Sequence, residues 1–278
     1  MKRLKRSERL IYITKYMVQR PGKSISLNHF VDALGVAKSS ISEDLALVKA
    51  AFAQMGLGRL ETEKGAAGGV QYLPAAEIDR RKELAQELCL KLNDPSRLIP
   101  GGFLYLTDII FSPQVAGSVG EVFATYFQKK QPHYVLTVET KGIPIALMTA
   151  YFLGVPLLVA RREHRVTEGS AVSITYVSGS SRRLQTMSLA RRALPQGSKV
   201  VVIDDFMKAG GTARGLHELL LEFNAEIVGT GVLIETAEPA QKLIEDYISL
   251  LILAGVDQGH KTVMVHPSSW VKGENIGQ

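Results

Sequence analysis

The stretch that most restricts how this chain can fold is Val200–Thr212, which reads Val-Val-Val-Ile-Asp-Asp-Phe-Met-Lys-Ala-Gly-Gly-Thr. Its apolar start predicts a buried strand that ends at Asp204 and Asp205. Adjacent carboxylates can accept hydrogen bonds from vicinal sugar hydroxyls, and backbone N–H groups of Lys208–Thr212 can surround a phosphate at a helix N-terminus. The segment lacks the Walker pattern. The alternative is an ordinary strand-loop-helix joint, which the ordered run of strand, acids, glycines and threonine disfavours.

The remainder of residues 75–278 alternates helix-like and strand-like segments. Helices are predicted at 75–92, 143–153, 212–223 and 243–253, and strands at 134–138, 155–160, 200–203 and 227–234, with an exposed antiparallel strand at 172–176. This alternation predicts an α/β domain with a mainly parallel sheet covered on both faces. Ligands of such domains bind at the carboxyl ends of the strands.

Positive charge is concentrated at the start of the chain. Residues 1–74 hold 12 Lys and Arg and 6 Asp and Glu, whereas residues 75–278 hold 21 of each. This asymmetry indicates a polyanion-binding module joined to a neutral body, although a solvated basic face without a partner would have the same charge. No apolar run is long enough to span a membrane, and no signal peptide is recognisable, so we expect a cytoplasmic protein. The single cysteine, Cys89, excludes an intrachain disulfide and is expected to be half-buried and inert.

Residues 1–74 predict three helices followed by a β-hairpin. The first helix covers about 8–20, the second follows Ser26 as N-cap, and the third starts at a capping box formed by Ser40 and Glu43. Two short strands at 59–63 and 70–73 flank a glycine-rich connection. This order is typical of a winged helix-turn-helix, whose third helix would enter the major groove of DNA. A small helical dimerisation domain is the alternative. The DNA-contacting candidates are Lys2, Arg3, Lys5, Arg6, Lys38, Ser39, Ser40, Ser42 and Lys64.

The Asp204–Thr212 loop resembles the phosphoribosyl-pyrophosphate signature of type I phosphoribosyltransferases. Glu139–Gly142 lies where that family has its pyrophosphate loop, Arg161 and Arg162 resemble its basic pair, and Ser178–Arg183 matches its flexible hood loop. The resemblance implies that this ligand binds together with Mg²⁺.

The whole chain resembles the purine operon repressors of Gram-positive bacteria, from residue 1 to about 255. The resemblance is carried by linked blocks at 37–45, 65–69, 100–108, 166–170, 176–181, 185–189 and 204–212. It implies a homodimer that represses purine synthesis and transport genes, is induced by 5-phosphoribosyl 1-pyrophosphate, and binds a guanosine tetraphosphate alarmone in the same pocket. Phe103 departs from the family, where Tyr is frequent. The implied effector-binding residues are Phe103, Tyr105, Glu139, Thr140, Lys141, Gly142, Arg161, Arg162, Asp204, Asp205, Phe206, Met207, Lys208, Ala209, Gly210, Gly211 and Thr212.

Two other functions compete with a non-enzymatic repressor. An active purine phosphoribosyltransferase with a nucleic-acid-binding extension would need a group for proton transfer near the base. Some purine-salvage relatives have an Asp at the fifth loop position, where this chain has Lys208. We therefore predict no catalytic residue. We also predict no metal held by the protein itself. An RNA-binding attenuator on the same fold is disfavoured because the basic residues lie in the N-terminal module.

Overall fold

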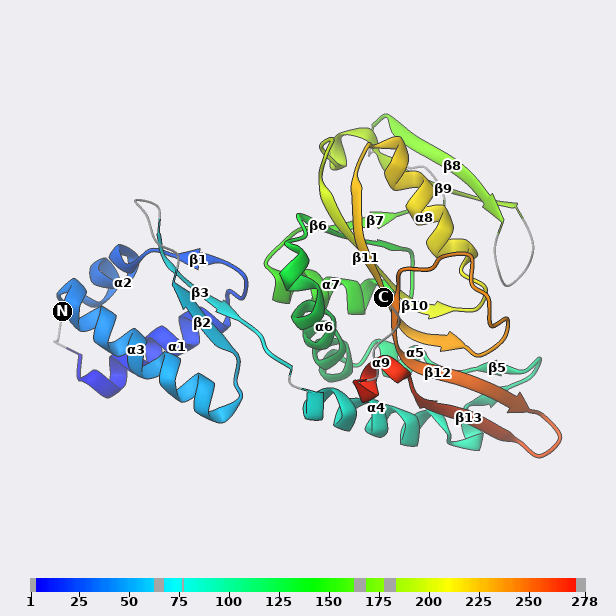
Figure 1. The fold of residues 1–278 in the computed structure, drawn as a ribbon, viewed down its shortest axis with the longest axis horizontal. Helices are drawn as coiled ribbons and strands as arrows, with labels where there is room; N and C mark the ends of the chain where they lie inside the picture. Colours follow the sequence, from blue (N-terminus) through cyan, green and yellow to red (C-terminus); the bar gives the residue numbers. More distant parts are fainter. Residues whose placement is uncertain (1–3, 63–67, 77, 163–168, 178–183, 274–278) are drawn as a thin grey trace.

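A computed structural model describes residues 4–62, 68–76, 78–162, 169–177 and 184–273. The chain forms a small N-terminal domain and a larger α/β domain, joined by an extended segment before helix α4 (Figure 1). The predicted division at residue 74 falls at the start of this segment.

The N-terminal domain is a winged helix. Its elements are α1 (Arg6–Val18), β1 (Ser24–Ile25), α2 (Leu27–Leu34), α3 (Lys38–Met55), β2 (Arg59–Thr62) and β3 (Val70–Leu73). The strands form one sheet in the order β1-β3-β2. Ser26 caps α2 by accepting a hydrogen bond from the His29 N–H, as the sequence predicts. Ile13, Phe30 and Ile41, one from each helix, are fully buried in its core.

The larger domain is built on a six-stranded sheet with the order β13-β12-β11-β10-β6-β7. All neighbouring strands are parallel except β12 and β13, so the prediction of a mainly parallel sheet is confirmed. The strands are β6 (Tyr134–Val138), β7 (Leu157–Ala160), β10 (Lys199–Met207), β11 (Glu226–Thr236), β12 (Ile248–Asp257) and β13 (Thr262–Pro267).

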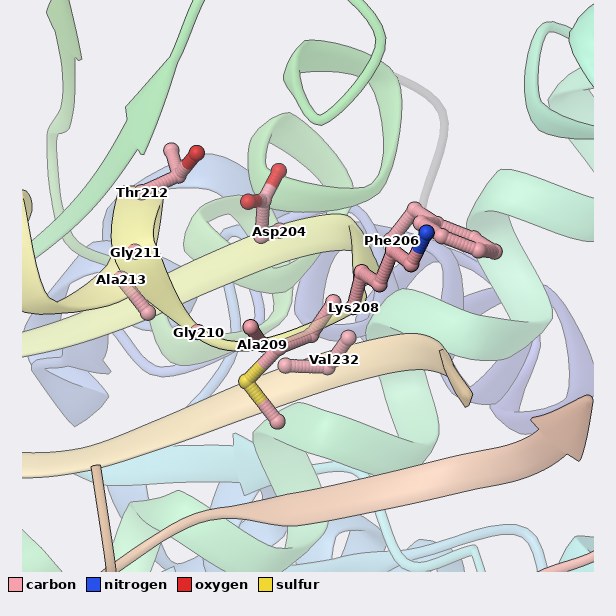
Figure 2. Close-up of a pocket in the computed structure, with 10 residues that line it drawn as sticks. Asp204, Phe206, Lys208, Ala209, Gly210, Gly211, Thr212, Ala213 and Val232 are labelled. Atoms are coloured by element: carbon pink, nitrogen blue, oxygen red, sulfur yellow. The ribbon is translucent and has the colours of Figure 1, made fainter. Parts of the chain in front are cut away.

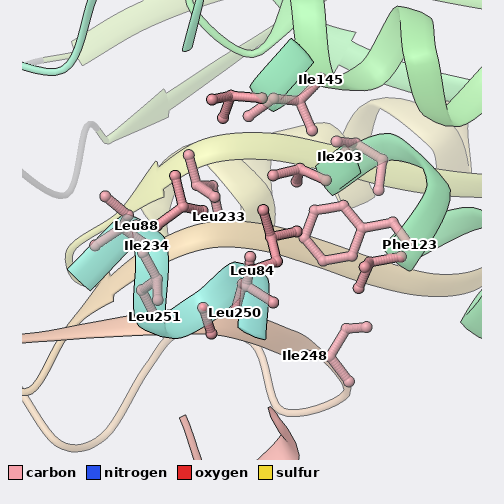
Figure 3. Close-up of a cluster of buried hydrophobic side chains, with 14 of the residues drawn as sticks. Leu84, Leu88, Phe123, Ile145, Ile203, Leu233, Ile234, Ile248, Leu250 and Leu251 are labelled. Atoms are coloured by element: carbon pink, nitrogen blue, oxygen red, sulfur yellow. The ribbon is translucent and has the colours of Figure 1, made fainter. Parts of the chain in front are cut away.

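Helices cover both faces of this sheet, as continuous apolar strands require. On one face α4 (Ile78–Leu92), α6 (Pro113–Phe127) and α7 (Ile143–Leu153) bury side chains such as Leu88, Phe123 and Ile145 against the sheet (Figure 3). The other face packs on α8 (Gly211–Glu222) and on the antiparallel hairpin of β8 (Ala171–Val177) and β9 (Leu184–Ala190).

Four short elements lie between α4 and α6. They are the 3-10 helix η1 (Pro95–Arg97), the strands β4 (Leu98–Ile99) and β5 (Phe103–Leu104), which pair as a hairpin, and the helix α5 (Thr107–Ile110).

The prediction of a helix at 243–253 is wrong. Residues from Ile248 form strand β12, and residues 237–247 are an irregular connection. The apolar run from Ile248 to Leu253 is a strand buried on both faces, and hydrophobic periodicity does not separate such a strand from a buried helix.

The C-terminal region closes the apolar face around α4. The short helix α9 (Ser269–Lys272) buries Trp270, and the Arg81 guanidinium lies 4.4 Å from the centre of its ring. Cys89 is buried rather than half-buried, because it faces the same core, and burial raises the pKa of its thiol to about 11.

The two domains touch where α1 and α7 end. The Tyr151 hydroxyl donates a hydrogen bond to the Gln19 carbonyl oxygen over 3.2 Å. Gly22 and Gly154 have φ angles of +72° and +71°, and a Cβ atom on either would clash with the other segment's backbone. The Gly22 N–H donates to the Tyr72 carbonyl oxygen in β3 over 2.9 Å. This junction therefore connects α7 with both α1 and the wing strand.

Candidate functional site

The predicted acid pair lies near the carboxyl end of β10, which continues to Met207 and does not end at the acids as predicted. Asp204 is buried, and its Oδ1 accepts a hydrogen bond from the Asp205 backbone N–H over 2.9 Å. Burial, and secondly the neighbouring Asp205 carboxylate, raise the pKa of Asp204 well above its ordinary value. Burial also raises the pKa of Asp205. Hydrogen-bond donors or a cation brought by a ligand would stabilise the ionised pair.

The connection from β10 to α8 is a candidate anion-binding cradle. Gly210 is the N-cap of α8 with a φ of +84°, which favours glycine, and no side chain caps the helix. The first N–H groups of the helix are thus available to a phosphate. The Asp204 carboxylate and the Thr212 hydroxyl project from the same side of this connection (Figure 2). The cavity here is lined by Asp204, Phe206, Met207, Lys208, Ala209, Gly210, Gly211, Thr212, Ala213 and Val232.

The loop at residues 139–142 joins β6 to α7, next to the acid pair. Gly142 is the N-cap of α7. A Cβ atom at Gly142 would lie 2.5 Å from Thr137 Oγ1 and 3.1 Å from Asp204 Oδ1, so only glycine fits. The predicted pyrophosphate loop therefore packs closely beside Asp204, with no room for a side chain at Gly142.

The basic pair after β7 belongs to the same edge. The Arg162 backbone N–H donates to Glu139 Oε1 over 2.7 Å, and Arg161 Nη1 lies 3.6 Å from Glu139 Oε2. The Glu139 carboxylate thus holds the two loops together. The positive charges of Lys141 and Arg162 favour the ionised form of Asp205, against the larger effect of burial.

Sequence reasoning omitted Tyr176 from the site. This buried residue of β8 donates its hydroxyl to Gln185 Oε1 over 2.8 Å and also lies within hydrogen-bonding reach of Thr212. Burial raises the pKa of its phenol. A Cβ atom at Gly215 in α8 would lie 2.9 Å from the Tyr176 ring. The alternating pattern predicted an exposed antiparallel strand, whereas Tyr176 is buried and α8 brings it beside Thr212.

Phe103 and Tyr105 lie on and just after the β4–β5 hairpin. Their side chains are 67% and 45% exposed. The Arg97 guanidinium donates to both Asp108 carboxylate oxygens and to the Tyr105 carbonyl oxygen, which fixes the segment. These two aromatic side chains are thus available on the surface, and the described contacts hold their backbone rather than their rings.

The N-terminus of α3 forms the predicted DNA-facing surface. Lys38, Ser39 and Ser42 are exposed and Ser40 is half-exposed. The helix begins at Lys38 with Ala37 as N-cap and no side-chain cap, so the capping box predicted from Ser40 to Glu43 is wrong. The helix starts earlier because the chain is already extended at Ala37, after the left-handed Gly35. Uncapped N–H groups in the first turn can bind phosphate oxygens.

Arg6 has an internal partner as well as an exposed surface. Arg6 Nε and Arg9 Nε donate to the two carboxylate oxygens of Asp44 over 3.0 and 2.7 Å, and Asp44 is fully buried. Lys5 is the N-cap of α1, and its backbone N–H donates to Glu8 Oε2. Lys2, Arg3, Lys64 and the hood loop 178–183 lie outside the described residues.

No group of three or more His, Cys, Asp and Glu in the described ranges could hold a metal ion. None of the described helices is long and apolar enough to cross a membrane.

The comparisons with known proteins agree on both domains. Residues 5–74 match the family described as "Bacterial purine repressor, N-terminal", and residues 107–262 match "Phosphoribosyl transferase domain". The chain is 46% identical over 270 residues to the purine biosynthesis transcriptional repressor PurR of Bacillus subtilis (strain 168), covering 97% of this chain and 95% of that protein. It is 38% identical over 262 residues to the purine biosynthesis transcriptional activator PurR of Lactococcus lactis subsp. lactis (strain IL1403), covering 94% and 97%.

Solved structures support the fold of the larger domain. The adenine phosphoribosyltransferase of Rhodothermus marinus DSM 4252 superposes with a TM-score of 0.52 at 21% identity, covering 62% of this chain and 99% of that chain. The predicted fold, a winged helix followed by a phosphoribosyltransferase-type domain, is confirmed. This chain belongs to the family of bacterial purine repressors.

Proposed function

We propose that this chain is a cytoplasmic transcriptional repressor of purine biosynthesis and transport genes that binds double-stranded operator DNA through residues 1–74. The observation that carries the proposal is the pairing of an exposed, uncapped α3 N-terminus with an acid-pair and glycine-loop cradle in one chain. In a strain that lacks the protein, transcripts of purine genes should rise. A fall would indicate an activator, as the Lactococcus lactis relative is named.

The inducer in this proposal is 5-phosphoribosyl 1-pyrophosphate with Mg²⁺. Asp204 and Asp205 would accept hydrogen bonds from the ribose hydroxyls, residues 208–212 would bind the 5-phosphate, and residues 139–142 would bind pyrophosphate. The carboxylates of the described residues do not form a metal site by themselves. Carboxylate oxygens beside a bound phosphate are nevertheless suitable neighbours for a cation that the ligand carries. Mg²⁺ would neutralise pyrophosphate charge beside these carboxylates.

Two structural features support release of DNA by this ligand. The loop that would receive pyrophosphate leads into α7, and the other end of α7 contacts the winged helix at Gly22. Arg161 and Arg162 also offer positive charge for which ligand and DNA phosphates could compete. In either case the ligand acts only through unequal affinity for the free and DNA-bound states.

Two further partners are part of the proposal. A guanosine tetraphosphate alarmone would occupy the same pocket and oppose induction, so calorimetric titrations should show mutual exclusion of the two ligands. Independent simultaneous binding would contradict this. A homodimer is expected from the family, and sedimentation analysis of the purified protein should give twice the mass of 30.4 kDa.

We also propose that the domain binds its ligand without turnover. The Lys208 side chain, at the fifth loop position, is exposed and cannot accept a proton while it is charged. An active purine phosphoribosyltransferase is the alternative that the family match allows. Incubation with the ligand, Mg²⁺ and each of adenine, guanine, hypoxanthine, xanthine, uracil and orotate distinguishes the two. Nucleotide formation at about one turnover per second or faster would establish an enzyme.

The ligand-binding assignment is tested by the double variant Asp204→Ala, Asp205→Ala in an operator-binding assay. The variant should bind DNA as tightly as wild type, because the acids lie in the other domain, and should no longer be released by ligand. A normal response of the variant to ligand would show that the pocket is misassigned.

A further inference from the structure

Thr137 carries a hydroxyl that the fold leaves without a hydrogen bond. The residue lies in β6 and is 0% exposed, and Thr137 Oγ1 has no partner among the described residues. An unpaired buried hydroxyl costs stability relative to a valine of the same shape. Thr149, a second fully buried threonine in α7, differs because its hydroxyl donates to the Ile145 carbonyl oxygen over 2.9 Å.

The unpaired hydroxyl lies beside Gly142, in the loop at 139–142 of the proposed effector site. Both Thr137 Oγ1 and Asp204 Oδ1 lie within 3.1 Å of the position that a Cβ atom on Gly142 would occupy. The hydroxyl, the glycine of the pyrophosphate loop and the first carboxylate therefore form one packed layer. The three other unpaired buried atoms of the described residues belong to His29, Arg81 and Gln128, which lie in other parts of the fold.

We propose that Thr137 is a positioning residue for the effector, whose hydroxyl donates to the Asp204 carboxylate when the phosphosugar binds. This inference rests on the proposed function and extends it to a residue that does not touch the ligand. In the bound state an ionised Asp204 accepts hydrogen bonds from the ribose hydroxyls more strongly than the neutral acid does. Its surroundings oppose ionisation, because burial and Asp205 both raise its pKa. In this proposal the carboxylate reorients when the ligand binds, which brings it a second protein donor beside the Asp205 N–H and satisfies the Thr137 hydroxyl.

The experiment is calorimetric titration of the full-length protein with 5-phosphoribosyl 1-pyrophosphate and Mg²⁺ across a pH series. Thr137→Val keeps the shape of the side chain and removes the donor, so the dissociation constant should rise about tenfold or more. Thr137→Ser retains the donor and should stay within about threefold of wild type. Thr149→Val is the matched control, because it alters a buried threonine away from the site, and it should leave affinity within about twofold.

The pH profile separates positioning from a purely structural role. Protonation of Asp204 should weaken binding as pH falls. In Thr137→Val this weakening should begin at a higher pH, because loss of a donor to the charged form raises the pKa of the carboxyl. The other charged and titratable groups around the pair, Asp205, Lys141, Arg162 and Tyr176, are unchanged in both variants.

The outcomes are distinct. Thermal unfolding of ligand-free Thr137→Val should occur at or above the wild-type temperature, and a lower temperature would overturn the inference by showing a structural role. Wild-type-like affinity of Thr137→Val at every pH would also overturn it and leave the proposed function intact. Absence of binding by the wild-type protein would overturn the proposed function, and the inference with it.

Discussion

The two domains each bury an aspartate, and they treat it in opposite ways. In the winged helix, Asp44 receives hydrogen bonds from Arg6 and Arg9 at 3.0 and 2.7 Å. In the α/β domain, Asp204 lies beside Asp205, and burial and that second carboxylate both oppose its ionisation. A buried charge with close partners supports the fold, whereas a buried acid beside another acid is a feature of binding and catalytic sites. Asp44 therefore belongs to a structural ion pair, whereas a ligand could supply Asp204 with a charge partner.

The largest effect is expected at the structural aspartate. Asp44→Ala would remove the buried carboxylate that binds both arginines. Arg6 is half-exposed and keeps its ion pair with Glu43 at 3.5 Å, so most of the cost comes from the largely buried Arg9 and should be about 1.5–3 kcal/mol. Calorimetry should show loss or early unfolding of the winged helix while the α/β domain keeps its own transition. Asp32→Ala, which removes an exposed carboxylate of α2, is the control and should change little. Unaltered unfolding of Asp44→Ala would remove the distinction between the two aspartates.

A smaller effect is expected from a surface cation that has no such internal role. Lys38→Ala at the start of α3 should weaken operator binding about tenfold without a change in unfolding temperature. It should also lower the slope of log affinity against log salt by about 0.9, as expected for one lost phosphate contact. Lys49→Ala, an exposed lysine farther along the same helix, should bind nearly as wild type. Equal losses in both variants would indicate a general charge effect instead of a contact.

The smallest effect is expected at the junction between the domains. Gly154→Ala would place a Cβ atom 2.8 Å from the Pro21 carbonyl oxygen and force the segments apart. The factor by which the inducer lowers operator affinity should decrease several-fold in this variant. The affinity of the DNA-free protein for the inducer should change little. Gly197→Ala is the matched control. Gly197 has a φ of +74° and open space around it, so the substitution adds backbone strain without a steric clash. If both variants reduce the ratio equally, the contact does not connect the domains.

Local pattern predicted most of the fold. The three helices and hairpin of the N-terminal domain, and the strand-loop-helix segment that contains Asp204, were predictable because turn residues and capping residues mark most of their ends. Ser26 illustrates this, since its hydroxyl caps α2 as expected. The helix start at Ser40 was wrong because the backbone conformation around Ala37, and not a side-chain cap, sets the start of α3.

The parts that escaped prediction depend on tertiary packing. The strand from Ile248 is apolar on both faces, so its pattern also fits a helix. Tyr176 joins the site only because Gly215 allows its ring to pack on α8. The unpaired state of the Thr137 hydroxyl and the two arginines around Asp44 likewise depend on segments distant in sequence. The sequence indicated which loops lie together at the candidate site, but not the residues that support them.

The contact of Gly22 with Gly154 has a consequence for protein engineering. Apart from the hydroxyl of Tyr151, the contacts described there are made by main-chain atoms, which nearly every sequence possesses. A winged helix exchanged between two members of the family should therefore dock in the same orientation whenever both glycines are retained. Chimeric repressors that combine one operator preference with another effector preference should be obtainable by exchange at this point, with little redesign of the surrounding side chains.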